Sequence, residues 1–153
     1  ELVYRNLSED AKRQICAWKY GGEYDLYNLP SYEEMQVRQI GFMNPQREKN
    51  YYGFWDESIL VGFVNILEEK EEVFIGIGVN PDLCNKHYGQ RMLLITYEIS
   101  KKLYPDKPLY LEVRTWNIRA VKCYQKAGFR IDGQAYELTT GIGAGTFYRM
   151  IRE

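Results

Sequence analysis

The sequence contains a single histidine, His87, and only three cysteines, Cys16, Cys84 and Cys123. One histidine is too few for a histidine-rich metal centre, and it leaves little from which to build a histidine-based catalytic triad. The cysteines are odd in number and lack CxxC spacing, which argues against a disulfide framework and a structural zinc site. We therefore expect no metal, a reducing compartment, and a packing role for Cys123 in an apolar helix.

Positive and negative side chains are nearly equal in number, with 20 Lys and Arg residues and 21 Asp and Glu residues, so the formal net charge is −1. A general polyanion-binding protein would carry a basic excess, so we expect no nucleic-acid partner. Tyrosines are numerous and could stack on bases, so a nucleic-acid-binding α/β domain is an alternative that salt-dependent retention on heparin would favour. No apolar run approaches the roughly 18 residues of a membrane span, and the first residues are not signal-like. We expect a cytoplasmic protein with no membrane partner.

The proportions of apolar, charged and aromatic residues are typical of a folded domain. The chain has 153 residues, of which 45% are apolar. A domain of this size buries about 70% of its unfolded surface, which is enough for an ordinary core. We expect a single domain over residues 1–153, as a monomer or a homodimer.

Helix and strand patterns alternate along the chain. Ser8 and Ser31 precede two predicted helices, and Asn117 precedes another that ends at Gly128. Residues 90–103 have the apolar period of a helix. The glycine-rich residues 141–145 predict a hairpin tip rather than a nucleotide-binding loop, because no helix follows them. Strands are predicted over 51–55, 59–67, 73–79, 109–114, 129–138 and 147–151, which gives a mixed α/β layer structure.

The segment between the third predicted strand and the long helix has the features of an anion-binding loop. It reads Lys86-His87-Tyr88-Gly89-Gln90-Arg91. Free amides at a helix start attract phosphate, Gly89 permits close approach of the backbone, and Lys86 and Arg91 add positive charge. An ordinary strand-to-helix connection with solvated basic residues is the alternative interpretation.

A second group of candidate residues lies in the segment 109–129. Asn117 and Tyr124 are seven residues apart, which places them on one helix face about 10 Å apart. Tyr124 is a candidate proton donor, and Glu112 on the neighbouring strand is a candidate base. Taken singly, Asn117 could be only a helix cap, Tyr124 only a core residue and Glu112 only a salt-bridge partner.

Together these segments resemble the GCN5-related N-acetyltransferases. In that family the pyrophosphate loop follows the pattern Gln/Arg-x-x-Gly-x-Gly/Ala, from which Lys86 and Arg91 depart at the two ends. The later family pattern, Asn-x-x-Ala-x-x-x-Tyr-x-x-x-Gly-Phe, is matched in full by Asn117, Ala120, Tyr124, Gly128 and Phe129. The strand sequence LEVR is especially similar to the branch that acetylates the N-termini of ribosomal proteins.

The resemblance implies a twisted, mixed, mostly antiparallel sheet of six or seven strands with helices on both faces. It implies an acetyl-CoA-dependent N-acetyltransferase that releases CoA, in which Glu112 is the general base and Tyr124 the general acid. A non-catalytic acyl-CoA-binding regulatory module of the same fold is the alternative, since it would keep the cofactor site. The implied cofactor-binding residues are Ile77, Gly78, Val79, Lys86, His87, Tyr88, Gly89, Gln90, Arg91, Asn117, Ala120, Tyr124 and Lys126.

The loop after the first predicted helix is a candidate acceptor site. It carries Tyr20, Tyr24 and Tyr27 beside two acidic residues, and the family topology sets this loop over the acceptor end with Trp116 near its rim. Aromatic faces and carboxylates hold cations, so we expect a small or peptide-borne cationic amine as substrate. The loop could instead cap the sheet edge or form a dimer contact. The sequence does not identify the amine.

Overall fold

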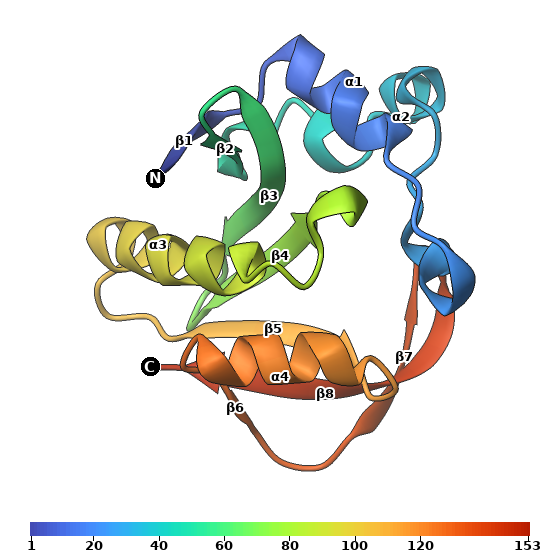
Figure 1. Ribbon diagram of the computed structural model, residues 1–153. Helices are drawn as coiled ribbons and strands as arrows, with labels where there is room; N and C mark the ends of the chain where they lie inside the picture. The colour runs from blue at the N-terminus through green and yellow to red at the C-terminus, as the bar shows by residue number, and fades with distance from the viewer. The chain divides into compact units, whose positions relative to one another are not determined.

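The structure is a computed structural model that describes residues 1–153 and forms an eight-stranded, mostly antiparallel sheet with four α-helices (Figure 1). This confirms the predicted mixed α/β class. The strands are β1 (Leu2–Asn6), β2 (Tyr51–Asp56), β3 (Ile59–Glu68), β4 (Val73–Val79), β5 (Leu109–Arg114), β6 (Arg130–Ile131), β7 (Tyr136–Thr140) and β8 (Gly143–Arg152). The helices are α1 (Glu9–Ala17), α2 (Tyr32–Arg38), α3 (Tyr88–Leu103) and α4 (Ile118–Lys126).

The sheet has eight strands, whereas the resemblance implied six or seven, and the difference arises at two places. No element is predicted from the sequence at β1, most of whose residues are exposed and which is held by pairing with β2. The single strand predicted over residues 129–138 is divided into β6 and β7, which pair with different parts of β8. Both differences arise from non-local pairing, which a local apolar pattern does not encode.

The contacts of the chain divide it into two compact units. The first contains Glu1–Asn65 and Ile77–Tyr88, and the second contains Ile66–Gly76 and Gly89–Glu153. The division crosses β3 and β4, so each of these strands contributes to both units. The single domain over residues 1–153 stays a prediction.

In the first unit, β1 pairs with β2 and β2 with β3, both antiparallel. Helices α1 and α2 begin at the predicted caps, where the side chains of Ser8 and Ser31 accept from Ala11 and Glu34 amides at 3.1 Å. The apolar faces of both helices contribute to one buried cluster, which comprises Leu7, Ala11, Ile15, Cys16, Tyr32, Met35, Phe42, Tyr51, Trp55 and Leu60.

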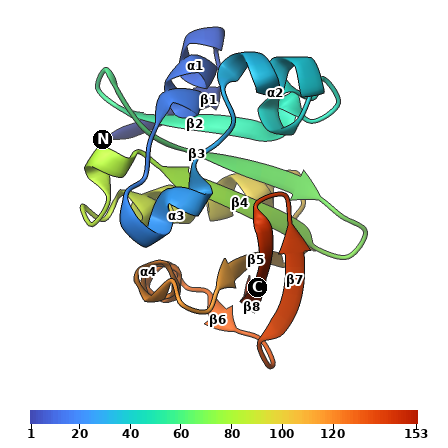
Figure 2. The same ribbon diagram turned by 90° about the vertical axis from the view of Figure 1, so that its right-hand side faces the viewer.

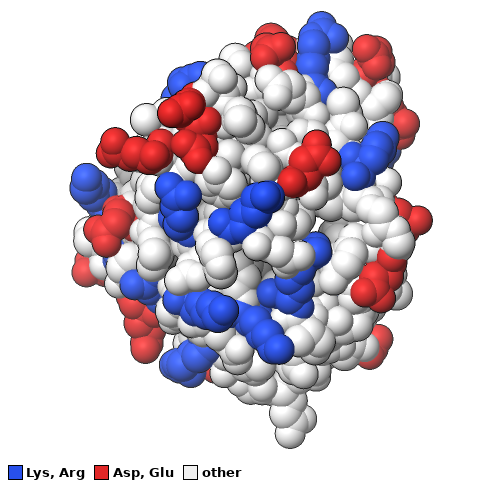
Figure 3. All heavy atoms as spheres, viewed as in Figure 1, with Lys and Arg blue, Asp and Glu red and all other residues white.

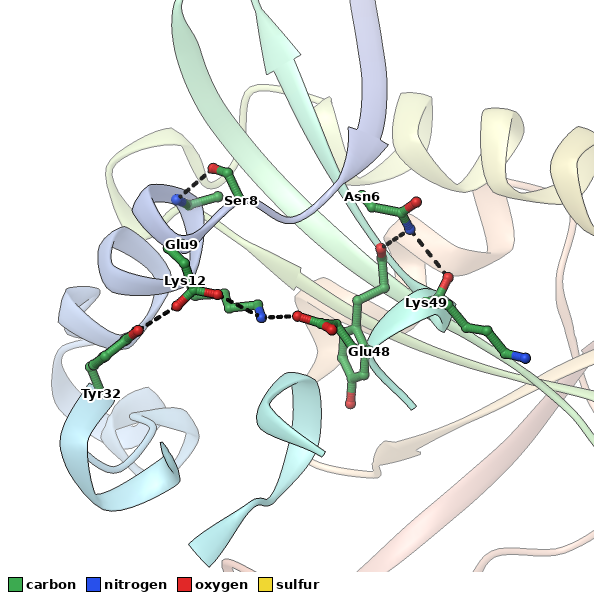
Figure 4. A network of polar contacts seen from close by, with 9 residues as sticks. Asn6, Ser8, Glu9, Lys12, Tyr32, Glu48 and Lys49 are labelled. Carbon is green, nitrogen blue, oxygen red and sulfur yellow. Dashed lines mark hydrogen bonds and ion pairs between the residues drawn. The ribbon is translucent and has the colours of Figure 1, made fainter. Parts of the chain in front are cut away.

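A buried lysine connects three segments of this unit (Figure 4). Lys12 on α1 is 2% exposed, and its Nζ donates to Glu9 at 3.1 Å and to Glu48. The hydroxyl of Tyr32, at the start of α2, donates to the other oxygen of Glu9. Burial opposes the charge on Lys12, but its hydrogen bonds to Glu48 and Glu9 outweigh this effect and raise its pKa.

In the second unit, β5 pairs antiparallel with β8 from Leu109–Arg152 to Arg114–Phe147. The start of β4 pairs with β5 in parallel, at Val73–Leu109 and Phe74–Tyr110. Alternate residues of β5 therefore face opposite sides, with an apolar side that is buried and a more polar side that carries Glu112. Helix α4 lies beside β5 and β8 (Figures 1 and 2), and β7 extends the sheet by pairing with β8.

The predicted hairpin tip joins β7 to β8, which pair from Tyr136–Phe147 to Thr140–Gly143. Arg114 is 6% exposed, and its guanidinium donates to the carbonyl oxygens of Ala144 and Gly143 at 3.1 Å. The side chain of Arg114, at the end of β5, therefore holds the tip of this hairpin. The glycine-rich segment forms a turn between two strands, as the sequence predicts.

Replacement of Gly128 by Ala is expected to lower the free energy of unfolding by roughly 1–3 kcal/mol. Gly128 follows α4 with φ +98°, and an added Cβ would lie 2.9 Å from Arg152 Nε. Arg152 would then lose its bond to the Ala127 carbonyl, which it makes at 3.0 Å. Urea unfolding measures the change. Gly133→Ala is the control, because Gly133 has φ +77° and open space around it; equal losses would show that the contact with Arg152 contributes nothing.

Candidate active site

The loop before α3 combines unusual backbone conformations with a helix start. Asn85 and His87 both have φ +67°, a left-handed conformation that costs a residue with a side chain about 1–2 kcal/mol. Such residues cluster where a loop binds a ligand. Gly89 is buried in the first turn of α3 and has no left-handed φ, so its contribution is the missing side chain.

The first residue of α3 is fixed to the end of β2. The Tyr88 hydroxyl donates to Asp56 Oδ2 at 2.5 Å. This bond orients the start of α3 within the first unit. Among the predicted cofactor residues, Tyr88 therefore has a clear positioning contact, whereas Lys86, His87 and Arg91 have exposed side chains.

The first turns of the helices differ in charge. Helices α1 and α2 carry acidic residues there, as the helix dipole favours. Helices α3 and α4 carry no acid in the first turn, where Arg91 and Arg119 lie instead. A cation at a helix N-terminus opposes the dipole, so the first turns of α3 and α4 are more positive than those of α1 and α2.

Helix α4 extends this basic character along one face. Arg119, Lys122 and Lys126 are exposed and spaced three and four residues apart, which places them together on the helix surface. Lysine and arginine side chains gather over this part of the molecule in Figure 3. Of these three residues, only Lys126 is predicted from the sequence as a cofactor contact. Basic residues at this spacing, in a helix without an N-terminal acid, could also have indicated Arg119 and Lys122.

Asn117 and Tyr124 occupy the two ends of α4. Asn117 is 8% exposed, and its Oδ1 accepts from the Ala120 amide at 3.2 Å, which confirms its role as the helix cap. Tyr124 is half-buried two turns later. Both residues therefore lie on the predicted helix at the predicted spacing, with Ala120 between them.

Glu112 lies on the polar side of β5, where it is half-buried. The hydroxyl of Tyr136, the first residue of β7, donates to Glu112 Oε2 at 2.5 Å. Burial, and then this hydrogen bond, raise the pKa of Tyr136, so the phenol stays protonated. Glu112 makes no ion pair, which removes the alternative interpretation of this residue as a salt-bridge partner. Sequence reasoning missed Tyr136, because it is 24 residues from Glu112.

The other carboxylates around this side of β5 are bonded differently. Glu72 accepts from the Arg149 guanidinium at 2.5 and 3.2 Å, and Asp132 accepts from the same group at 3.2 Å. Glu69 accepts from the Tyr110 hydroxyl at 2.8 Å. The Arg149 guanidinium is therefore paired with two carboxylates, Glu72 and Asp132, and the Glu112 carboxylate is bonded to no cation.

In the first unit, the predicted acceptor loop contacts the predicted cofactor strand. Tyr20 donates its hydroxyl to the Val79 carbonyl at 2.6 Å, and its amide donates to Asn28 Oδ1 at 2.6 Å. Gly78 packs so closely on Phe63 that an added Cβ would lie 2.4 Å from the ring. The structure therefore brings Tyr20 to the end of β4, beside Ile77–Val79.

Tyr24 and Tyr27 lie on a 3₁₀ helix, Gly22–Tyr27, and both are half-buried. Trp116 is 38% exposed and belongs to the second unit, just before α4. Its predicted proximity to the tyrosine loop stays a prediction. No group of three or more His, Cys, Asp or Glu side chains is arranged to hold a metal ion, and none of the helices is long and apolar enough to span a membrane.

Comparison with known proteins identifies a family that the chain matches. The model of the acetyltransferase (GNAT) family matches residues 10–129. No curated protein sequence matches the chain. A spermidine N-acetyltransferase from Vibrio cholerae, solved with CoA and spermine, is similar in structure with a TM-score of 0.78 at 19% identity, over 98% of this chain and 94% of that one. A GNAT-family acetyltransferase from Bacillus anthracis is similar with a TM-score of 0.79 at 17% identity, over 98% and 93%.

Proposed function

This chain belongs to the acetyltransferase (GNAT) family, and on that premise we propose its reaction, the residues that perform it and the class of its acceptor. The reaction is the transfer of the acetyl group of acetyl-CoA to a primary amine by direct attack in a ternary complex. The observation that carries the assignment of roles is the half-buried Glu112, which is bonded to a phenol and to no cation.

The residues present fit the anionic cofactor. Acetyl-CoA supplies the acetyl group as a thioester, which is activated toward attack by an amine. The amides at the start of α3, with Gly89 and Arg91, would hold the pyrophosphate. The basic face of α4 adds positive charge for phosphate groups, and the main chain of Ile77–Val79 would pair with the pantetheine arm. Asn117 and Ala120, at the start of α4, are further proposed cofactor residues.

Once the attacking amine is neutral, its nitrogen bonds to the carbonyl carbon and loses one proton, which Glu112 takes directly or through one water. Tyr124 gives its phenolic proton to the sulfur as the carbon–sulfur bond breaks. One proton is removed and one is delivered, so the charges balance at the end of the reaction. Both residues belong to the second unit, Glu112 on β5 and Tyr124 on α4.

The proposed acceptor is a cationic amine. Tyr24 and Tyr27 offer aromatic faces, and Glu23 and Asp25 on the same 3₁₀ helix offer negative charge. A polyamine and a peptide N-terminus are both consistent with this chemistry. The similar structure from Vibrio cholerae is named as a spermidine N-acetyltransferase, which favours a polyamine. The LEVR strand is similar to the branch that acetylates the N-termini of ribosomal proteins, which favours a peptide.

A thiol-release assay tests the proposal. Acetyl-CoA is mixed with the protein and with spermidine, spermine or a peptide that has a free N-terminus, and CoA release is compared with background hydrolysis. We expect release above background with at least one of these amines, and its loss in Glu112→Gln. Binding of acetyl-CoA by calorimetry, without release for any amine, would favour the non-catalytic acyl-CoA-binding module.

Replacement of Tyr24 and Tyr27 together by Ala is expected to raise the acceptor KM about 10-fold and to leave acetyl-CoA affinity unchanged, since each cation–π contact is worth about 0.5–1 kcal/mol at an exposed site. Initial rates and calorimetry measure the two quantities. Replacement of both by Phe is the matched control, because it keeps the rings and should keep the parental KM. A loss of thermal stability alone in the Ala variant would show that the loop is only scaffold.

A further inference from the structure

Tyr136 is the residue that the structure bonds to the Glu112 carboxylate. We propose that Tyr136 is a positioning residue for the general base: it fixes the orientation of the Glu112 carboxylate, so that the second oxygen of that group can take the proton of the amine. This inference rests on the proposed function, in which Glu112 takes the proton of the amine. It assigns a role in the reaction to β7, which carries none of the family motif.

The strand register explains how the two side chains meet. Glu112 is opposite Arg149 in the β5–β8 pair, and Arg114 is opposite Phe147. Phe147 in turn is opposite Tyr136 in the β7–β8 pair. Residues two apart on a strand share a face, so Glu112, Arg149 and Phe147 lie on the same side, and Tyr136 joins them from β7. The hairpin that fixes this register is held at its tip by Arg114.

The bond leaves the carboxylate able to act. Tyr136 uses Oε2 of Glu112, so Oε1 is the oxygen that can receive a proton from the amine or from a water. A phenol that donates to a carboxylate limits rotation of the group. Burial and this hydrogen bond raise the pKa of Tyr136, so its hydroxyl remains a donor at neutral pH.

Glu112 is bonded to Tyr136 and to no cation, although Arg149 lies opposite it on β8. Arg149, its neighbour on β8, is bonded to Glu72 and Asp132, and Arg114 on the same strand is bonded to backbone carbonyls. The titratable and charged groups around Glu112 are Tyr110 and Arg114 on β5, Arg149 on β8, Tyr136 on β7, Glu69 and Glu72 between β3 and β4, and Asp132 after β6. The hydroxyl of Tyr136 is therefore the group whose removal changes the state of Glu112 most directly.

Tyr136→Phe removes this hydroxyl and keeps the ring. We expect turnover to fall about 10-fold, since this is the effect of losing one hydrogen bond to a charged group. The acceptor KM and the Kd for acetyl-CoA should each change less than about twofold, because the hydroxyl contacts Glu112 and neither substrate. Steady-state rates and calorimetry measure these quantities.

Tyr110→Phe is the matched control, because it removes a phenol–carboxylate bond on the same side of β5, to Glu69. It should leave turnover at the parental value. Parental turnover in Tyr136→Phe, or an equal loss in both variants, would overturn the inference.

A double-mutant cycle separates this inference from the proposed function. If Tyr136 acts through Glu112, then Tyr136→Phe combined with Glu112→Gln has the turnover of Glu112→Gln alone. Additive losses would show that Tyr136 acts elsewhere. Parental turnover in Glu112→Gln itself would overturn the proposed base. An impaired Glu112→Gln with a parental Tyr136→Phe would overturn only the role of Tyr136.

Discussion

Tyr124→Phe is expected to lower turnover about 100-fold or more, while the Kd for acetyl-CoA changes less than about twofold. The substitution removes the proposed proton donor and keeps the aromatic ring on α4, so packing and cofactor contacts are preserved. Without an acid, the sulfur must leave as a thiolate, which is a poorer leaving group. Steady-state rates and calorimetry measure the two quantities.

The pKa of the leaving thiol provides the control for this prediction. An acetyl thioester whose thiol is more acidic needs less help from a general acid, so the loss in Tyr124→Phe should shrink with such a donor. A loss that is the same for both donors would indicate misplacement of the substrate rather than a missing proton. Parental turnover in Tyr124→Phe would show that Tyr124 is a packing residue.

The second large effect concerns stability. Glu9→Gln combined with Glu48→Gln is expected to lower the free energy of unfolding by about 3 kcal/mol at neutral pH, because it leaves the buried ammonium of Lys12 without a counter-charge. This value is at the low end for a broken buried pair, since both carboxylates are about half exposed. Urea unfolding followed by circular dichroism measures it.

Lys12→Met separates charge from packing. It keeps a chain of similar length and leaves two carboxylates that reach water, so the expected loss is below about 1 kcal/mol. Glu34→Gln, which breaks the exposed pair with Arg38, should cost less than about 0.5 kcal/mol. If Lys12→Met cost as much as the double variant, the stem of Lys12 and not its ion pairs would stabilise this unit.

The pH dependence of this network has a definite sign at each end. Hydrogen bonds from Tyr32 and Lys12 lower the pKa of Glu9, so its contribution is present above its unfolded pKa and is lost as pH falls through the folded value. The raised pKa of Lys12 means that its contribution is complete below about 10.5 and is lost as pH rises through the folded value. The double variant should therefore lose the dependence on Glu9 at acid pH. At alkaline pH its stability should rise with pH, because burial alone then acts on Lys12 and lowers its pKa.

The sequence by itself determined the features that depend on neighbouring residues. The caps at Ser8, Ser31 and Asn117 form as predicted, because a side chain three residues away satisfies a free amide. Gly128 ends α4 because it alone at that point tolerates φ +98° without strain. The same local spacing located the loop before α3, and it assigned Glu112 to a strand and Tyr124 to the following helix.

The tertiary structure alone decided which distant groups meet. Tyr136 reaches Glu112 across 24 residues, Tyr20 reaches Val79 across 59, and Arg149 reaches Glu72 across 77. Nothing in the local pattern of either partner marks these pairs. They depend on strand register and helix packing, where a shift of one residue would turn each side chain to the opposite face. The residues that can act were therefore visible in the sequence, whereas the bonds that orient them arise from long-range pairing of the chain.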